Sequence, residues 1–292
     1  MRRCEVVEEP TGYRLHDHVV WTHDGAAQWR KAVTLFLEEG IADNQRLLYI
    51  GGQQVEQLHA DLEALPHLDE LLASRRLEVW ATETEPGHLE DSVGVATVAR
   101  LDQLVDRAVA DGFSGLRLAS EVTGALADPG DATAHLRFEL LVDQVAATRE
   151  LVVMCGMDRL HVDAGALRDE LALHPLRGLA SDVPLLHAVD VDTWAVRGKV
   201  DMLSQCGFER ALASLPGVLR GDVLHLQLHE LEFIDVAGLR ALVRLAEAVM
   251  PRGRVLLHEP PGWVARMLRL AFGPVPGLEL PERETRRARS LR

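Results

Sequence analysis

The sequence predicts an α/β protein with two domains, each built around a mainly parallel β-sheet. In the first part of the chain, short apolar runs typical of strands alternate with segments whose apolar residues recur at helical spacing. This alternation indicates a parallel sheet covered by helices on both faces. A turn-rich stretch at 180–184 then precedes a second strand and helix series, and 292 residues are enough for two domains.

Composition and charge restrict the classes of function. The formal net charge of −14 argues against nucleic-acid binding, which normally requires a basic face. Cys4, Cys155 and Cys206 are far apart and lack metal-ligand spacing, so we expect reduced thiols. Since no stretch approaches the roughly 20 apolar residues of a membrane span, we expect a cytoplasmic protein without membrane contact.

The first half of the chain follows a strand and helix order. Asp24-Gly25 is a cap for a helix that carries Trp29, Val33 and Phe36 on one face. The expected strands are 15–23, 47–52, 77–83, 116–119 and 151–155. The expected helices are 26–40, 54–65, 95–110 and 134–148.

The clearest strand, turn and helix unit lies in the second half. Leu224, Leu226 and Leu228 alternate with polar residues, which indicates a half-buried strand over 223–231. Asp235 is a good N-cap for the helix that follows. The other expected elements are a strand near 194–201, a helix near 202–215, a strand at 254–258, a helix near 262–271 and a short strand near 275–280.

The turn at 234–239, Ile-Asp-Val-Ala-Gly-Leu, resembles the Asp-Ser-Ser/Thr-Gly-Leu signature of STAS domains, the module of anti-sigma-factor antagonists. The resemblance implies a STAS domain at 184–281 that binds a regulatory protein, such as an anti-sigma factor. It places the partner-binding surface at Asp235, Val236, Ala237, Gly238 and Leu239. Val236 and Ala237 stand where the family has phosphorylatable hydroxyls, so this turn cannot be phosphorylated.

Five segments of the first half, in order, resemble the MEDS domain, a sensory module related to RecA-like ATPases. They are 17–21 (DHVVW), 36–51 (FLEEGIADNQRLLYIG), 116–123 (LRLASEVT), 155–159 (CGMDR) and 171–175 (LALHP). The resemblance covers about 12–180 and implies a RecA-like, three-layer parallel-sheet domain. The family often has a Cys where this chain has Val20.

The expected ligand pocket of the first domain is formed by His18, Trp21, Glu121, Asp158 and Arg159. Apart from the resemblance, these residues lie on or just after predicted strands, where pockets of parallel sheets form. A surface ion pair or helix cap is an equal alternative for the three charged residues. A small organic molecule would fit Trp21 as an apolar wall and His18 as a hydrogen-bond partner.

We expect no metal site and no catalytic residues. His16, His18 and His23 are close in sequence, but no Cys and no spaced carboxylate completes a ligand set with them. The turn at 21–27 lacks the Lys of a phosphate loop, and Asp24 occupies the helix start where a phosphate would bind. The sequence therefore predicts a protein that is not an enzyme and does not bind ATP.

Together these features predict a bacterial-type signalling protein, in which a sensory domain controls a partner-binding domain, with a homodimer as one form of assembly. The basic segment 282–292 is interpreted as a disordered tail. Two alternatives stay open. The chain could be a divergent nucleotide-binding ATPase of the RecA-like type, or a dimeric scaffold without a ligand.

Overall fold

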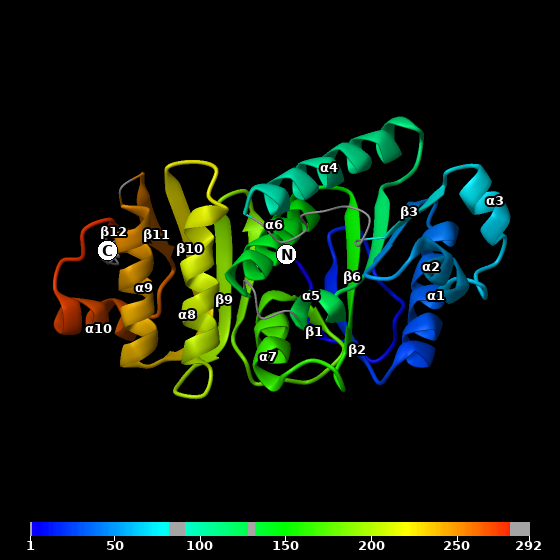
Figure 1. The fold of residues 1–292 in the computed structure, drawn as a ribbon. Helices are drawn as coiled ribbons and strands as arrows, with labels where there is room; N and C mark the ends of the chain where they lie inside the picture. Colours follow the sequence, from blue (N-terminus) through cyan, green and yellow to red (C-terminus); the bar gives the residue numbers. More distant parts are fainter. Residues whose placement is uncertain (1, 82–90, 128–131, 251, 281–292) are drawn as a thin grey trace, which may run out of the picture.

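The structure is a computed structural model that describes residues 2–81, 91–127, 132–250 and 252–280 (Figure 1). Within these residues the first sheet has seven strands, all parallel, in the order β1-β7-β2-β6-β5-β3-β4. The strands are β1 (Glu5–Val6), β2 (His18–His23), β3 (Arg46–Gly51), β4 (Leu77–Ala81), β5 (Leu116–Glu121), β6 (Leu151–Asp158) and β7 (Leu176–Arg177).

Helices cover both faces of the first sheet. They are α1 (Ala26–Ala42), α2 (Val55–Asp61), α3 (Leu68–Ala73), α4 (Asp91–Ala110), α5 (Thr123–Ala127), α6 (Ala132–Thr148) and α7 (Ala164–Leu173). Successive residues of a strand point to opposite faces, so Val19 packs with Phe36 of α1 while Val20 belongs to the core that contains Leu140 of α6. The first domain thus has three layers.

The second sheet is mixed, with the order β12-β11-β10-β9-β8. Its strands are β8 (Leu185–Asp190), β9 (Thr193–Val200), β10 (Val223–Ile234), β11 (Arg254–His258) and β12 (Leu278–Glu279). Only β8 runs antiparallel to its neighbour. The helices α8 (Gln205–Ser214), α9 (Val236–Val249) and α10 (Gly262–Phe272) pack on the face that carries Leu224, Leu226 and Leu257.

The two sheets are joined through α6 and α7, which lie between them in Figure 1. Helix α6 packs on β6 of the first sheet and on β8 of the second. Leu140 of α6 and Leu186 of β8 belong to one continuous hydrophobic core. A change in the position of α6 would therefore alter its packing against the second sheet.

The α/β class and the parallel first sheet are confirmed, and the strand at 254–258 has the predicted bounds. The first strand begins at His18 and not at residue 15, because His16 has a left-handed backbone with φ of 76°. Several elements were not predicted: β1, β7, β8, α3, α5 and α7. The predicted strand residues Thr82 and Glu83 and the basic segment 282–292 lie outside the described residues.

None of the helices in the described residues has the length and apolar composition needed to cross a membrane.

Candidate functional site

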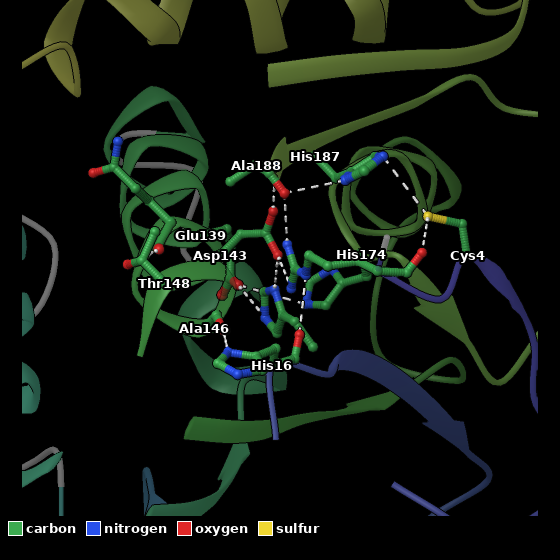
Figure 2. A network of polar contacts seen from close by, with 12 residues as sticks. Cys4, His16, Glu139, Asp143, Ala146, Thr148, His174, His187 and Ala188 are labelled. Atoms are coloured by element: carbon green, nitrogen blue, oxygen red, sulfur yellow. Dashed lines mark hydrogen bonds and ion pairs between the residues drawn. The ribbon is translucent and has the colours of Figure 1, made fainter. Parts of the chain in front are cut away.

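Five polar side chains lie together in the interior of the first domain, between its sheet and the helices α6 and α7. We call them the central cluster: His18, Glu139, Asp143, Cys155 and His174. Cys155 is 2% exposed and the other four are fully buried. Figure 2 shows Glu139, Asp143 and His174 converging in this network. Buried polar groups are costly unless they are paired, so the cluster is a candidate functional site.

The local sequence explains why these side chains meet. His18 and Val20 are on the same face of β2, and Val20 is the register partner of Cys155 on β6. Glu139 and Asp143 are four residues apart on α6, so both face the same side of the helix. His174 is the C-terminal cap of α7, and its Nε2 atom lies 3.5 Å from Glu139 Oε2.

One side-chain atom from each of four residues in the central cluster lies within 4.8 Å of the other three. Glu139 Oε2 lies 3.5 Å from His18 Nε2 and 3.5 Å from His174 Nε2. Cys155 Sγ lies 3.6 Å from His18 Nε2 and 3.9 Å from Glu139 Oε2. The nitrogen-to-oxygen distances exceed those of ordinary hydrogen bonds, about 2.7–3.2 Å. The four residues offer two imidazoles, a carboxylate and a thiol, which is a set that could hold a metal ion.

His18 and His174 each have a contact from the second ring nitrogen, Nδ1, to a group on the side of the ring away from Glu139. His174 Nδ1 donates to the backbone oxygen of Glu170 at 2.7 Å, because a carbonyl can only accept. His18 Nδ1 lies 3.1 Å from Asp143 Oδ1. These bonds orient each Nε2 atom towards Glu139.

Burial and neighbouring charges shift the pKa values in the central cluster. Burial, assisted by His18, lowers the pKa of His174 to about 3, so His174 is neutral at physiological pH. Burial, together with Glu139 and Glu170, raises the pKa of the Cys155 thiol well above its ordinary value. Burial alone would lower the pKa of His18, but hydrogen bonds to Asp143 and Glu139 outweigh it and the pKa is raised.

A second buried pair adjoins the central cluster. His135 Nε2 and Glu170 Oε1 are 2.7 Å apart, and His135 Nε2 is also 3.6 Å from Glu139 Oε1. Burial opposes the protonation of His135, but the charge and hydrogen bond of Glu170 dominate and raise the pKa of His135 to about 9. This pair is therefore a hydrogen-bonded ion pair, and it lies beside the more widely spaced atoms of the central cluster.

Asp143 connects the central cluster to the second sheet. Its Oδ2 atom accepts a hydrogen bond of 2.6 Å from the backbone N–H of Ala188 in β8. Arg2 joins the same contact, with Nη2 at 2.8 Å from Asp143 Oδ1 and Nη1 donating to the Ala188 oxygen at 3.0 Å. Burial opposes ionisation of Asp143, yet Arg2 and His18 hold its pKa well below the ordinary value. We call this arrangement the Asp143 joint.

The structure separates the five predicted ligand-pocket residues. His18 is in the central cluster, but Trp21 is three residues further along β2 and faces the opposite side of the sheet, where it packs with the α1 core. Glu121 and Asp158 do lie close together at the carboxyl edge, because Thr123 donates its hydroxyl proton to Glu121 and accepts from the Asp158 N–H. Burial raises the pKa of Glu121.

Arg159, the fifth predicted pocket residue, is on the surface. Its Nη2 atom lies 2.6 Å from Asp24 Oδ2, so the two residues form the surface ion pair that was the alternative interpretation of Arg159. This contact ties the turn after β2 to the turn after β6. It also occupies the acidic group at the start of α1.

Two pockets flank the junction of the domains, and none of the five predicted pocket residues lines them. One, of about 460 Å³, lies between Pro175, Arg177 and Arg197. The other, of about 500 Å³, lies between Arg2, His16 and His229. Residues of both domains line each of these two pockets.

The five residues of the predicted partner surface occupy the end of β10 and the first turn of α9. Asp235 caps the helix, since its Oδ1 atom accepts from the Gly238 N–H at 2.8 Å. Val236 and Ala237 are exposed, whereas Gly238 and Leu239 are buried. A Cβ atom at Gly238 would come within 2.5 Å of Ile234, so glycine allows α9 to approach the sheet.

Sequence reasoning missed most of the central cluster. Glu139 and Asp143 were not among the predicted site residues. Cys155 was interpreted as a reduced thiol without metal-ligand spacing, and His174 was noted only as part of a family motif. One usable signal was the series His135, Glu139 and Asp143, which recur four residues apart on one face of a largely apolar helix.

Comparison with known proteins identifies the first domain. The family described as the methanogen/methylotroph, DcmR sensory domain, or MEDS, matches residues 17–175, more than half of the 292-residue chain. No curated protein matches. Among solved structures, one similar chain is in the "Crystal Structure of DUF1998 helicase MrfA bound to DNA and AMPPNP", with 12% identity and a TM-score of 0.34. The match covers 90% of this chain and 39% of that one. On the family match, this chain belongs to the MEDS family of sensory domains.

Proposed function

We propose that the protein is a signalling protein in which the MEDS domain senses a ligand and the C-terminal domain is a STAS-type output that binds a regulatory protein, such as an anti-sigma factor. It acts by binding and not by catalysis. A ligand in the first domain would change the affinity of the second domain for its partner, to the extent that the ligand distinguishes the two states.

The observation that carries the partner-binding part is an exposed apolar surface on the second domain. Met202 and Leu203 follow β9, Phe233 is near the end of β10, Val236 begins α9, and Trp263 is in the first turn of α10 after β11. All five are substantially exposed, from 39% for Trp263 to 82% for Leu203. Because these strands are parallel, their carboxyl ends share one edge. We call this the output edge; exposed apolar groups of this kind are typical of interaction sites.

The output edge includes the turn that resembles the STAS signature. Phe233 and Trp263 stack with ring centroids 6.4 Å apart, and Val236 and Ala237 begin the adjacent helix. Small and aromatic apolar side chains without charge suit the centre of a protein interface. A mixed sheet with its helices packed on one face also agrees with the proposed STAS domain.

The Asp143 joint supplies a route between the two functions. Asp143 accepts hydrogen bonds from His18 of the first sheet and from Ala188 of the second. A ligand that changes the position of α6 would move both contacts together. The proposal therefore needs no long chain of intermediate residues.

The test compares Ala237→Asp with Ala248→Asp. Both alanines are exposed on α9, but Ala248 is at the opposite end of the helix. A carboxylate at 237 would be buried against the partner without a counter-ion, which should lower affinity by orders of magnitude. Partners are recovered on each immobilised protein and identified by mass spectrometry, with melting measured in parallel.

The proposal expects an anti-sigma factor or related regulator to be recovered by the wild type and by Ala248→Asp, and to be lost with Ala237→Asp. Equal recovery by all three folded proteins would show that the output edge is not the contact surface. Recovery of no regulator by the wild type would also contradict the STAS assignment.

A further inference from the structure

The geometry points to a transition-metal site in the central cluster: we propose that His18, Glu139, Cys155 and His174 bind one zinc-type divalent cation. The inference concerns the first domain alone. It does not depend on the identity of the second domain or of its partner.

The spacing of the ligand atoms is the first argument. A tetrahedral site with bond lengths of about 2.0–2.3 Å has ligand-to-ligand distances of roughly 3.3–3.8 Å. Four of the six distances within this set run from 3.5 Å, between His18 Nε2 and Glu139 Oε2, to 3.9 Å, between Cys155 Sγ and Glu139 Oε2. One atom from each of the four residues lies within 4.8 Å of all the others.

The orientation of the histidines is the second argument. Histidines that bind metals usually donate their second ring N–H to a carboxylate or a backbone carbonyl. His18 has such a contact with Asp143, and His174 has one with the Glu170 oxygen. Each therefore presents the lone pair of Nε2 to the centre. His174 Nε2 is fully buried and has no hydrogen-bond partner among the described residues.

Protons are the alternative occupants of this region. A protonated His18 could neutralise Glu139, and a protonated His135 could neutralise Glu170. The His135–Glu170 pair has the 2.7 Å separation of a hydrogen-bonded ion pair. In contrast, the Nε2 atoms of His18 and His174 are both 3.5 Å from Glu139 Oε2. Protons would also leave His174 Nε2 unsatisfied. The cation accounts for both features.

The ligand types select the metal. Imidazole and thiolate favour zinc and neighbouring transition ions, and exclude calcium and magnesium, which take oxygen ligands. On binding, the metal replaces the proton of the Cys155 thiol, so one proton is released and a sulfur-to-metal bond forms. Four protein ligands leave no open position, which is typical of a structural or sensing site and not of catalytic zinc.

The test begins with the wild-type protein, purified without an affinity tag and analysed for bound metals. After the metal is removed with a chelator, Co²⁺ is titrated as a spectroscopic probe and Zn²⁺ is used to displace it. We expect one equivalent per chain, a thiolate-to-cobalt charge-transfer absorption, and the strong d–d absorption of four-coordinate cobalt.

Two thiol variants assign the site. Cys155→Ser should abolish the charge-transfer absorption and lower zinc affinity at least about 100-fold, more than the loss of an outer contact would. Cys206→Ser removes an exposed thiol and should leave both unchanged. His174→Gln should lower affinity but keep the charge-transfer absorption, because Cys155 remains.

Because the wild-type measurement needs no variant to fold, it decides the matter alone if the folded protein binds no stoichiometric Zn²⁺ or Co²⁺; the site is then absent. A charge-transfer absorption that survives in Cys155→Ser but is lost in Cys206→Ser would equally overturn the assignment. Loss of partner binding with intact metal binding would contradict only the proposed output function.

Discussion

The two domains differ in which side chains they bury and which they expose. The first buries His18, Glu139 and His174 in its interior, while the second fills its interior with leucines such as Leu226 and exposes Phe233 and Val236 at the output edge. Burial of polar groups costs free energy unless they are paired or bind a ligand, and exposure of apolar groups is typical of a docking surface. On this contrast rest the two proposals, an internal binding site in the first domain and a partner-binding surface on the second.

The largest effect is expected where the two regions meet, at Asp143. Asp143→Ala would remove the carboxylate that pairs with Arg2 Nη2 and with His18 Nδ1 and that accepts from the Ala188 N–H. Removal of one member of a buried charged network costs about 3–5 kcal/mol. The free energy of unfolding, measured by urea denaturation, should fall by this amount.

The matched control is Asp106→Ala, whose carboxylate is 69% exposed in a surface ion pair with Arg149. Such pairs contribute about 0–1 kcal/mol. Similar losses from the two substitutions would mean that the Asp143 joint is no stronger than a surface contact.

The stability of the second domain should depend on the volume of its buried side chains and not on buried charges. Leu226→Ala removes a fully buried side chain and should cost about 2–5 kcal/mol, because a cavity is left among the surrounding leucines. Leu270→Ala, at a side chain 71% exposed, should change the free energy of unfolding by less than about 0.5 kcal/mol. Thermal melting of both variants checks this, and a Leu226→Ala protein as stable as Leu270→Ala would refute the packing.

Metal should stabilise the first domain if its interior is a binding site. At free zinc 100 times the dissociation constant, binding to the folded state alone adds about 2.7 kcal/mol. The melting temperature should rise with zinc in the wild type and not in Cys155→Ser. Magnesium is the control cation and should have no effect. Equal shifts in both proteins would place the stabilising zinc elsewhere.

The smallest effect concerns the cap of α9. Asp235 accepts from the Gly238 N–H, so Asp235→Ala should cost about 1 kcal/mol. Asp235→Asn keeps an oxygen acceptor and should cost less. Denaturation of the two variants tests this; if both lose equal stability, the charge and not the hydrogen bond caps the helix.

Local patterns in the sequence predicted much of the fold. The strand at 254–258 and the α1 and α9 helices were found from periodicity and capping residues. Strands β1 and β7 have two residues each, too few for any period. Helix α7 could have been found, because Asp163 is an N-cap whose side chain accepts from the Gly165 N–H at 2.6 Å.

The central cluster could not be predicted in the same way. His18 and Cys155 are 137 residues apart in the chain, and only the adjacency of β2 and β6 brings them together. The sequence placed three histidines near each other, but no Cys and no suitably spaced carboxylate completed a ligand set with them. The fold gives one of the three, His18, both Cys155 and Glu139. The predicted ligand pocket combined His18 with Trp21, although residues three apart on a strand point to opposite faces of the sheet.

X-ray absorption at the metal edge of the tag-free protein tests the internal site most directly. The account predicts four-coordinate zinc with one sulfur at about 2.3 Å and nitrogen or oxygen at about 2.0–2.2 Å, and loss of the sulfur in Cys155→Ser. A shell of oxygen and nitrogen alone, unchanged in Cys155→Ser, would contradict it, because the metal would then be bound outside the central cluster.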